Sequence, residues 1–84
     1  MSELPKKGDN FAGCVCDQAI LLDHAYVWIF SRDGHAVTIS IPVSQYKDAL
    51  LDHYLREEML DSMAKTVFQQ ISNKGKVLYF DQGQ

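Results

Sequence analysis

The sequence contains few of the residues that small proteins use for covalent or metal-based stabilisation. It has two cysteines, two prolines and one tryptophan in 84 residues. The cysteines, Cys14 and Cys16, are separated by a single residue. A disulfide between them would be strained, because alternate residues of an extended chain have Cα atoms about 6.5–7 Å apart. We therefore expect two free thiols, which are typical of a reducing cytoplasm.

Long apolar runs and an excess of basic residues are also missing. The longest apolar stretch, residues 25–30, is far shorter than the ~20 residues that a transmembrane helix needs. The first ten residues have no apolar segment behind their charges, so we expect no secretion signal. The formal charge of −3 differs from the basic balance of proteins that coat nucleic acid. These absences favour a cytoplasmic protein without a membrane segment.

The residues that are present are those of a small globular domain. Apolar residues make up 46% and charged residues 23% of the chain, which excludes disordered, collagen-like and mucin-like classes. We expect residues 1–10 to be a flexible lead-in and residues 11–84 to form one domain. A chain this short buries only about 60% of its unfolded surface, so a partner subunit would be a useful further source of stability.

A β-hairpin is the clearest element. Residues 25–31 and 35–41 are rich in β-branched and aromatic side chains, and Asp33-Gly34 between them is a strong signal for a tight type I′ turn. With this turn as the loop, Arg32 pairs with His35 and the larger apolar side chains fall on one face of the hairpin. The pairs on that face are Phe30 with Val37, Trp28 with Ile39, and Tyr26 with Ile41.

The remaining pattern predicts an α+β fold with the order β-β-β-α(α)-β. Residues 14–22 form a further strand, and residues 76–81 form the last one. Between residues 44 and 72 the apolar pattern is helical, but its phase shifts by about a third of a turn. We therefore expect a bent helix or two consecutive helices, with the break at residues 53–56. These cover one face of an antiparallel sheet.

The hairpin aromatics and the second helical stripe are expected to form the core. Trp28, Phe30, Tyr26 and Phe68 would dominate its energetics, because each ring buries up to about 150–250 Å². With this face closed, we expect no pocket of the ~300–1,000 Å³ that ligand sites usually have. The sequence therefore predicts no catalytic residues, no cofactor and no enzymatic activity.

The thiols and histidines offer a metal-binding alternative. Cys14 and Cys16 project from one face of a strand, and His24, His35 or His53 could complete a tetrahedral zinc site. The same residues could supply a cysteine nucleophile and a histidine base. Structural zinc sites, however, use cysteine pairs two to four residues apart, and no second pair exists here. We interpret the cysteines as small core residues and the histidines as solvated turn residues.

Two surfaces are candidates for a protein interface. The outer face of the hairpin is neither fully apolar nor fully polar, unlike the polar face that a solvated antiparallel sheet usually shows. Its candidate residues are Val27, Ile29, Ala36 and Thr38. The predicted helices also carry an acidic group, for which the simplest interpretation is a solvated outer face. If it binds instead, it would meet a basic surface on a partner. Its residues are Asp48, Asp52, Glu57, Glu58 and Asp61.

The sequence favours a small cytoplasmic accessory protein that acts by binding another protein, as an adaptor, inhibitor or regulator. We expect it to be a homodimer, because contiguous exposed apolar patches mark interfaces. Such domains are common in bacterial and phage genomes, which is an argument by association alone. One alternative is a small nucleic-acid-associated regulator, but the lysines and arginines are dispersed and the aromatic face is needed for the core. The other alternative is the Cys/His metal-binding domain.

Overall fold

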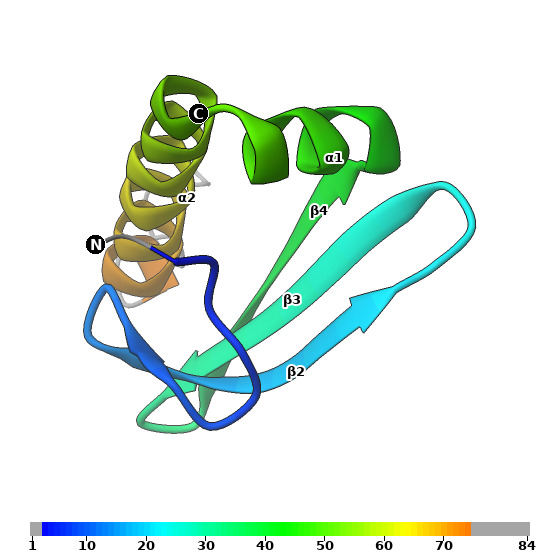
Figure 1. Cartoon of the computed structure of the whole chain (residues 1–84). Coiled ribbons are helices and arrows are strands. Elements are labelled where there is room, and N and C mark those ends of the chain that lie inside the picture. Colours follow the sequence, from blue (N-terminus) through cyan, green and yellow to red (C-terminus); the bar gives the residue numbers. More distant parts are fainter. Residues whose placement is uncertain (1–2, 75–84) are drawn as a thin grey trace, which may run out of the picture.

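A computed structural model describes residues 3–74 of the chain. It confirms the α+β class: a curled antiparallel sheet is followed by two helices that lie over its concave side (Figure 1). The sheet has the order β1-β2-β3-β4. Its strands are β1 (Asn10–Phe11), β2 (Cys14–Leu21), β3 (Ala25–Arg32) and β4 (His35–Pro42). The helices are α1 (Val43–Leu51) and α2 (His53–Lys74).

The central hairpin of β3 and β4 has the predicted register. Arg32 pairs with His35 beside the turn, and Trp28 pairs with Ile39 in the middle of the strands. Asp33 and Gly34 both have positive φ, 51° and 81°, as a type I′ turn requires. The turn chemistry and the alternation of side chains agree on one pairing, which explains why sequence alone specified it.

Strand β2 contains a bulge that its sequence pattern does not reveal directly. Cys16 pairs with Phe30, whereas Gln18 pairs with Ile29, so the register shifts between these two β2 residues. One extra residue in a strand moves every later side chain to the opposite face. The bulge therefore explains why the alternation of apolar and polar residues in this strand is poor. The predicted strand of residues 14–22 is confirmed and ends one residue earlier, at Leu21.

The helical region consists of two helices, which is one of the two arrangements expected from the sequence. The break falls at Asp52, one residue before the predicted range of 53–56. Asp52 has extended backbone angles (φ −123°, ψ 117°) and ends α1. Its carboxylate Oδ1 then accepts hydrogen bonds from the backbone N–H groups of Tyr54 (2.9 Å) and Leu55 (3.2 Å). Asp52 is therefore the N-cap of α2.

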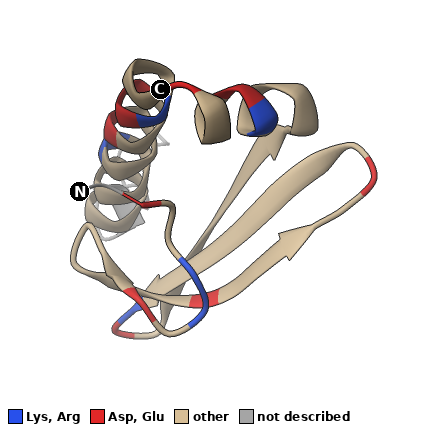
Figure 2. Cartoon of the chain, viewed as in Figure 1, with Lys and Arg blue, Asp and Glu red and all other residues tan. Residues whose placement is uncertain are grey.

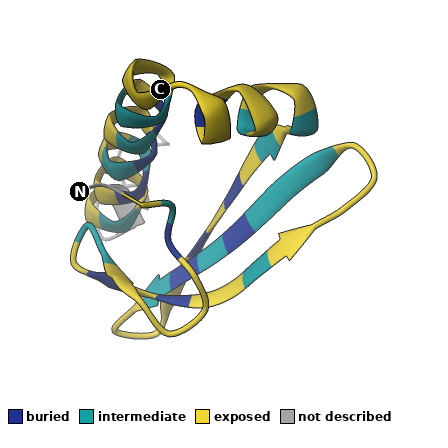
Figure 3. Cartoon of the chain, viewed as in Figure 1, coloured by how far each residue is buried: buried dark blue, intermediate teal, exposed yellow. Residues whose placement is uncertain are grey.

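The core lies between the concave side of the sheet and the helices (Figure 3). Trp28 and Phe30 are fully buried, and residues of both helices join them in one cluster. These helix residues are Ala49, Met59, Met63 and Val67. The prediction that the second helical stripe covers the aromatic face is confirmed.

One predicted core residue is placed wrongly by the sequence argument. Phe68 is 62% exposed on α2. The buried residues Met59, Met63 and Val67 recur every four positions and define the helix face that meets the sheet. Phe68 is one residue beyond Val67, which rotates it by about 100° around the helix axis and away from that face.

The segment before β1 runs along the core. Pro5 is buried, and its carbonyl oxygen accepts a hydrogen bond of 2.9 Å from the indole Nε1 of Trp28. The backbone N–H of Gly8 donates to the carbonyl of Cys16 (2.8 Å). The flexibility of residues 1–10 stays a prediction, and the expected strand at residues 76–81 lies outside the described part of the chain. Between residues 3 and 74, no helix has the length and apolar character needed to cross a membrane.

Candidate functional site

The outer face of the sheet is the first candidate surface. Apart from the terminal pair Ala25–Pro42 and the unpaired bulge residue Asp17, the register of β2, β3 and β4 assigns nine side chains to it. They are Val15, Gln18, Ile20, Val27, Ile29, Ser31, Ala36, Thr38 and Ser40. None of them is charged, and Figure 2 shows the charged residues gathered on the helices, at turns and around the N-terminal part of the sheet. Both helices lie on the other side of the sheet, so neither covers this face (Figure 1).

The open sheet face, as we call this nine-residue surface, has its apolar residues near its middle. Val27 and Ile29 of β3 are half-buried, whereas Ala36 and Thr38 of β4 are exposed. The bulge places Ile20 directly opposite Val27, where it is 42% exposed. Sequence reasoning named four residues of this face but missed its β2 contribution, Val15 and Ile20. The only sequence signal for them was the broken alternation of β2.

The five acidic residues named from the sequence have different local contacts. Asp52 caps α2, and Asp61 forms an exposed ion pair with Lys65 at 3.1 Å. Glu57 is half-buried, and its Oε2 has no hydrogen-bond partner within residues 3–74. The remaining two, Asp48 on α1 and Glu58 on α2, line the same cleft. The structure therefore separates these residues by role.

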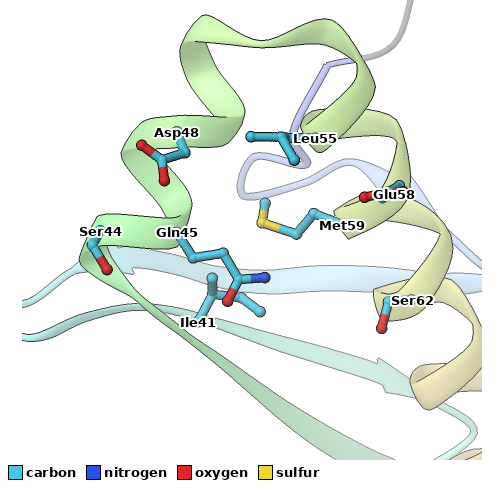
Figure 4. A pocket seen from close by; sticks show the side chains of 8 residues that line it. All are labelled: Ile41, Ser44, Gln45, Asp48, Leu55, Glu58, Met59 and Ser62. Carbon is cyan, nitrogen blue, oxygen red and sulfur yellow. The ribbon is translucent and has the colours of Figure 1, made fainter.

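The cleft between the two helices is open and has a volume of about 430 Å³. Figure 4 shows Asp48 and Glu58 on opposite sides of it, with Gln45 and Met59 between them. A second hollow of about 410 Å³ lies where the N-terminal segment meets Tyr26 and the helix corner. Both hollows reach the volume of a ligand site, which the sequence argument did not predict, but they are open clefts and not enclosed pockets. The buried rings Trp28 and Phe30 line neither hollow.

The cysteines are core residues. Cys14 and Cys16 are buried and free, and the Cys16 thiol donates to the carbonyl of Gln18 at 3.2 Å. Burial raises the pKa of the Cys16 thiol, and the negative charges of Asp9 and Asp17 raise it further. A reactive cysteine needs the opposite, a lowered pKa and access to solvent.

The histidines lie away from the thiols. His24 is exposed in the turn after β2, at the end of that strand opposite to the cysteines, and its carbonyl oxygen accepts from the N–H of Val43 at 2.9 Å. His35 is exposed beside the β3–β4 turn, and His53 is exposed at the start of α2. Within the described range, no three His, Cys, Asp or Glu side chains come together as metal ligands. Cys14, Cys16 and His24 therefore do not form a site with one another.

The described chain is thus a small α+β domain with an uncharged outer sheet face and an acidic cleft between its helices. Comparisons with models of protein families, with curated proteins and with solved structures find no match.

Proposed function

We propose that this protein acts by binding other proteins, without chemistry of its own, and that the open sheet face joins two copies as a homodimer. Its role is then that of an adaptor, inhibitor or regulator. The two free thiols agree with a cytoplasmic location. The observation that carries the proposal is the absence of charge from the nine paired residues of the open sheet face. The charged residue within β2, Asp17, is the unpaired bulge residue.

This absence is informative because the rest of the chain is rich in charge. Charged residues form 23% of the sequence, and a solvated sheet face normally alternates apolar inward with polar or charged outward positions. An interface has the opposite composition, with an apolar centre, few charges and a polar rim. Val27, Ile29 and Ile20 supply the centre, and Gln18, Thr38 and Ser40 have the polar character of a rim.

The size of the domain supports self-association. Burial of apolar surface contributes about 25 cal/mol per Å², and a domain of this length leaves a larger share of its surface in water than a longer one. Covering the open sheet face with a second copy would add apolar burial that the single domain lacks. A twofold arrangement suits such a face, because the same patch then meets itself.

The test is the mass of the full-length protein in solution, measured by light scattering coupled to gel filtration. We expect a dimer for the unaltered chain and a monomer for Ile29→Glu, because a buried unpaired carboxylate at the interface is costly. Ile29→Thr, which keeps the β-branched shape, should weaken the dimer without threatening the fold. Gln69→Glu, which adds the same charge at an exposed position of α2, is the matched control and should stay dimeric.

A monomeric unaltered chain would overturn the proposed dimer. So would a dimer with equal stability in both Ile29 variants, provided that circular dichroism shows them folded.

A further inference from the structure

We propose that the outer edge of β4 binds an extended segment of a partner protein, which adds to the sheet as a further strand and carries a lysine or arginine into the acidic cleft. The inference rests on the proposed protein-binding function but not on the homodimer. It uses the outward backbone groups at the edge of β4, although the side chains of Ala36, Thr38 and Ser40 also belong to the open sheet face. It specifies the chemistry of the partner: a β-forming, basic peptide segment. This is the recognition mode in which backbone hydrogen bonds supply affinity and side-chain pockets supply specificity.

The backbone of β4 presents unused hydrogen-bonding groups. Arg32 and His35, the two residues that flank the turn, form a hydrogen-bonded pair. Along an antiparallel ladder such pairs alternate with pairs whose backbone groups point away from the partner strand. The N–H and C=O groups of Ala36, Thr38 and Ser40 therefore point away from β3. Within residues 3–74 no other strand pairs with this edge, and none of these three residues makes another backbone hydrogen bond. An eight-residue edge strand with no charged side chain is a template for a further strand.

A groove lies beside this edge. It has a volume of about 270 Å³ and lies between β4, at Thr38 and Ser40, and α2, at Ser62 and Thr66. It shares Ile41 and Ser62 with the larger cleft between the helices, so the two hollows adjoin. A strand added along β4 would therefore point toward the larger cleft at the Ile41 end.

The charge of the larger cleft defines the ligand. Asp48 and Glu58 line it, and among residues 3–74 no lysine, arginine or histidine lines either hollow. Neither carboxylate takes part in an ion pair with any residue from 3 to 74. A cationic side chain from the ligand would meet two carboxylates, and such complementarity supplies specificity and a fast on-rate.

The position of α2 favours a peptide segment over a second copy at this edge. Helix α2 packs on β4, and its residues form one wall of the groove. Antiparallel pairing of two β4 edges would bring two α2 helices onto the same face of the joined sheet. Paired strands are about 4.8 Å apart, whereas packed helices need 8–10 Å, so a second copy would also have to find room for its own α2 beside the first. A single extended segment brings no second helix.

Hydrogen exchange of the full-length protein, followed residue by residue by NMR, tests whether the edge is free. The amides of Ala36, Thr38 and Ser40 should exchange rapidly, and those of Val37 and Ile39, which bond to β3, should be protected. Protection of all five amides in the free protein would mean that the edge is already occupied and would overturn the proposal.

Selection from a library of random dodecapeptides displayed on phage tests the ligand. We expect the selected sequences to combine a run of β-branched residues with lysine or arginine at one end. The selected peptide, synthesised, should protect the Ala36, Thr38 and Ser40 amides when it binds. Failure to select any peptide, sequences without a basic residue, or binding that leaves the amides of Ala36, Thr38 and Ser40 unprotected would each contradict the inference.

Matched variants separate the two parts of the site. Asp48→Asn with Glu58→Gln should weaken binding of the selected peptide about tenfold or more and reduce its salt dependence. Asp61→Asn removes a carboxylate of α2 outside the groove and should leave binding unchanged. Thr38→Pro removes an outward N–H and should also weaken binding, whereas Thr38→Ala keeps that N–H and should bind. Equal binding by all these variants would overturn the inference. Ile29→Glu tests only the dimer, so failure of either proposal is recognised separately.

Discussion

At the scale of single residues, Trp28 links the sheet to α1 and to the N-terminal segment. Its ring is fully buried, lies tilted against Tyr26 with 4.4 Å between ring centroids, and meets Tyr46 in an edge arrangement at 6.4 Å. Its indole N–H also binds the carbonyl of Pro5. A tryptophan is well suited to this place because it combines a large apolar ring with one donor that must find a partner when buried.

Replacing Trp28 with phenylalanine should destabilise the protein by about 2 kcal/mol. The smaller ring leaves a cavity, and the Pro5 carbonyl loses its partner. Urea unfolding measures the loss, and NMR of residues 3–9 should show that the segment becomes more mobile. Phe30→Leu, which alters the core without touching Pro5, should destabilise the protein but leave that segment unchanged. Equal mobility of the segment in both variants would contradict the role assigned to the indole.

Cys16 makes stability depend on pH in the alkaline range. Burial raises its pKa in the folded chain, so the thiolate forms more readily in the unfolded chain. Stability is therefore fully present below about pH 8.5 and falls as the pH rises above it, by at most about 1.4 kcal/mol per pH unit. Unfolding of the unaltered chain and of Cys16→Ala at pH 7 and pH 9.5 measures the effect. The variant should lose less stability over this interval, and an equal loss in both chains would refute the prediction.

At the scale of secondary-structure elements, the corner between α1 and α2 is held by two polar side chains. Asp52 caps α2, and the Arg56 guanidinium of α2 reaches back to the carbonyls of Ala49 (3.1 Å) and Leu50 (3.4 Å) at the end of α1. Each helix end thus has a partner for backbone groups that the helix itself cannot satisfy. This corner sets how far the helices open around the acidic cleft.

Asp52→Ala should lower the free energy of unfolding by about 1 kcal/mol, because two N–H groups of the first turn of α2 lose their acceptor. Asp61→Ala is the control, since its exposed ion pair with Lys65 contributes about 0.5 kcal/mol or less. Thermal unfolding of both variants measures the difference. Equal effects of the two substitutions would mean that Asp52 acts only as a surface charge.

The strands and helices differ in how far the sequence predicts them. The β3–β4 pairing was predictable residue by residue, because the Asp33-Gly34 turn and a period of two act over neighbouring positions. The β2 bulge was not predictable, because its only trace in the sequence is a broken alternation of apolar and polar residues, which has many other causes. For the helix break, the phase change was visible, but the capping role of Asp52 was visible only once its carboxylate was seen beside the N–H groups of Tyr54 and Leu55.

At the scale of the whole molecule, charge is unevenly distributed. Five acidic residues lie on the helices or at their junction, whereas the nine residues of the open sheet face carry no charge; Asp17, the bulge residue of β2, is an exposed carboxylate of the sheet (Figure 2). Trp28, Phe30 and the α2 stripe fill the interior, and the two surfaces to which we assign function are the open sheet face and the groove between β4 and the helices. Both are suited to protein segments, whose affinity comes from area and backbone hydrogen bonds.

If two copies are joined by the open sheet face, their stability depends on concentration. The melting temperature of the unaltered protein should rise as its concentration increases, because unfolding is then coupled to dissociation. The melting temperature of Ile29→Thr should depend less on concentration over the same range. Differential scanning fluorimetry over a hundredfold range of concentration measures both. A melting temperature independent of concentration in the unaltered chain would argue against the dimer.

The amino-acid sequence by itself determined the fold class, the central hairpin with its register, and the aromatic face that the helices cover, because these follow from local turn chemistry and periodicity. It also identified Val27, Ile29, Ala36 and Thr38 as one outer face. Only the tertiary structure decided that Ile20 joins this face and that Asp48 and Glu58 meet across a cleft beside β4. These placements depend on a bulge and on a helix corner, whose geometry is set by contacts between residues distant in the chain.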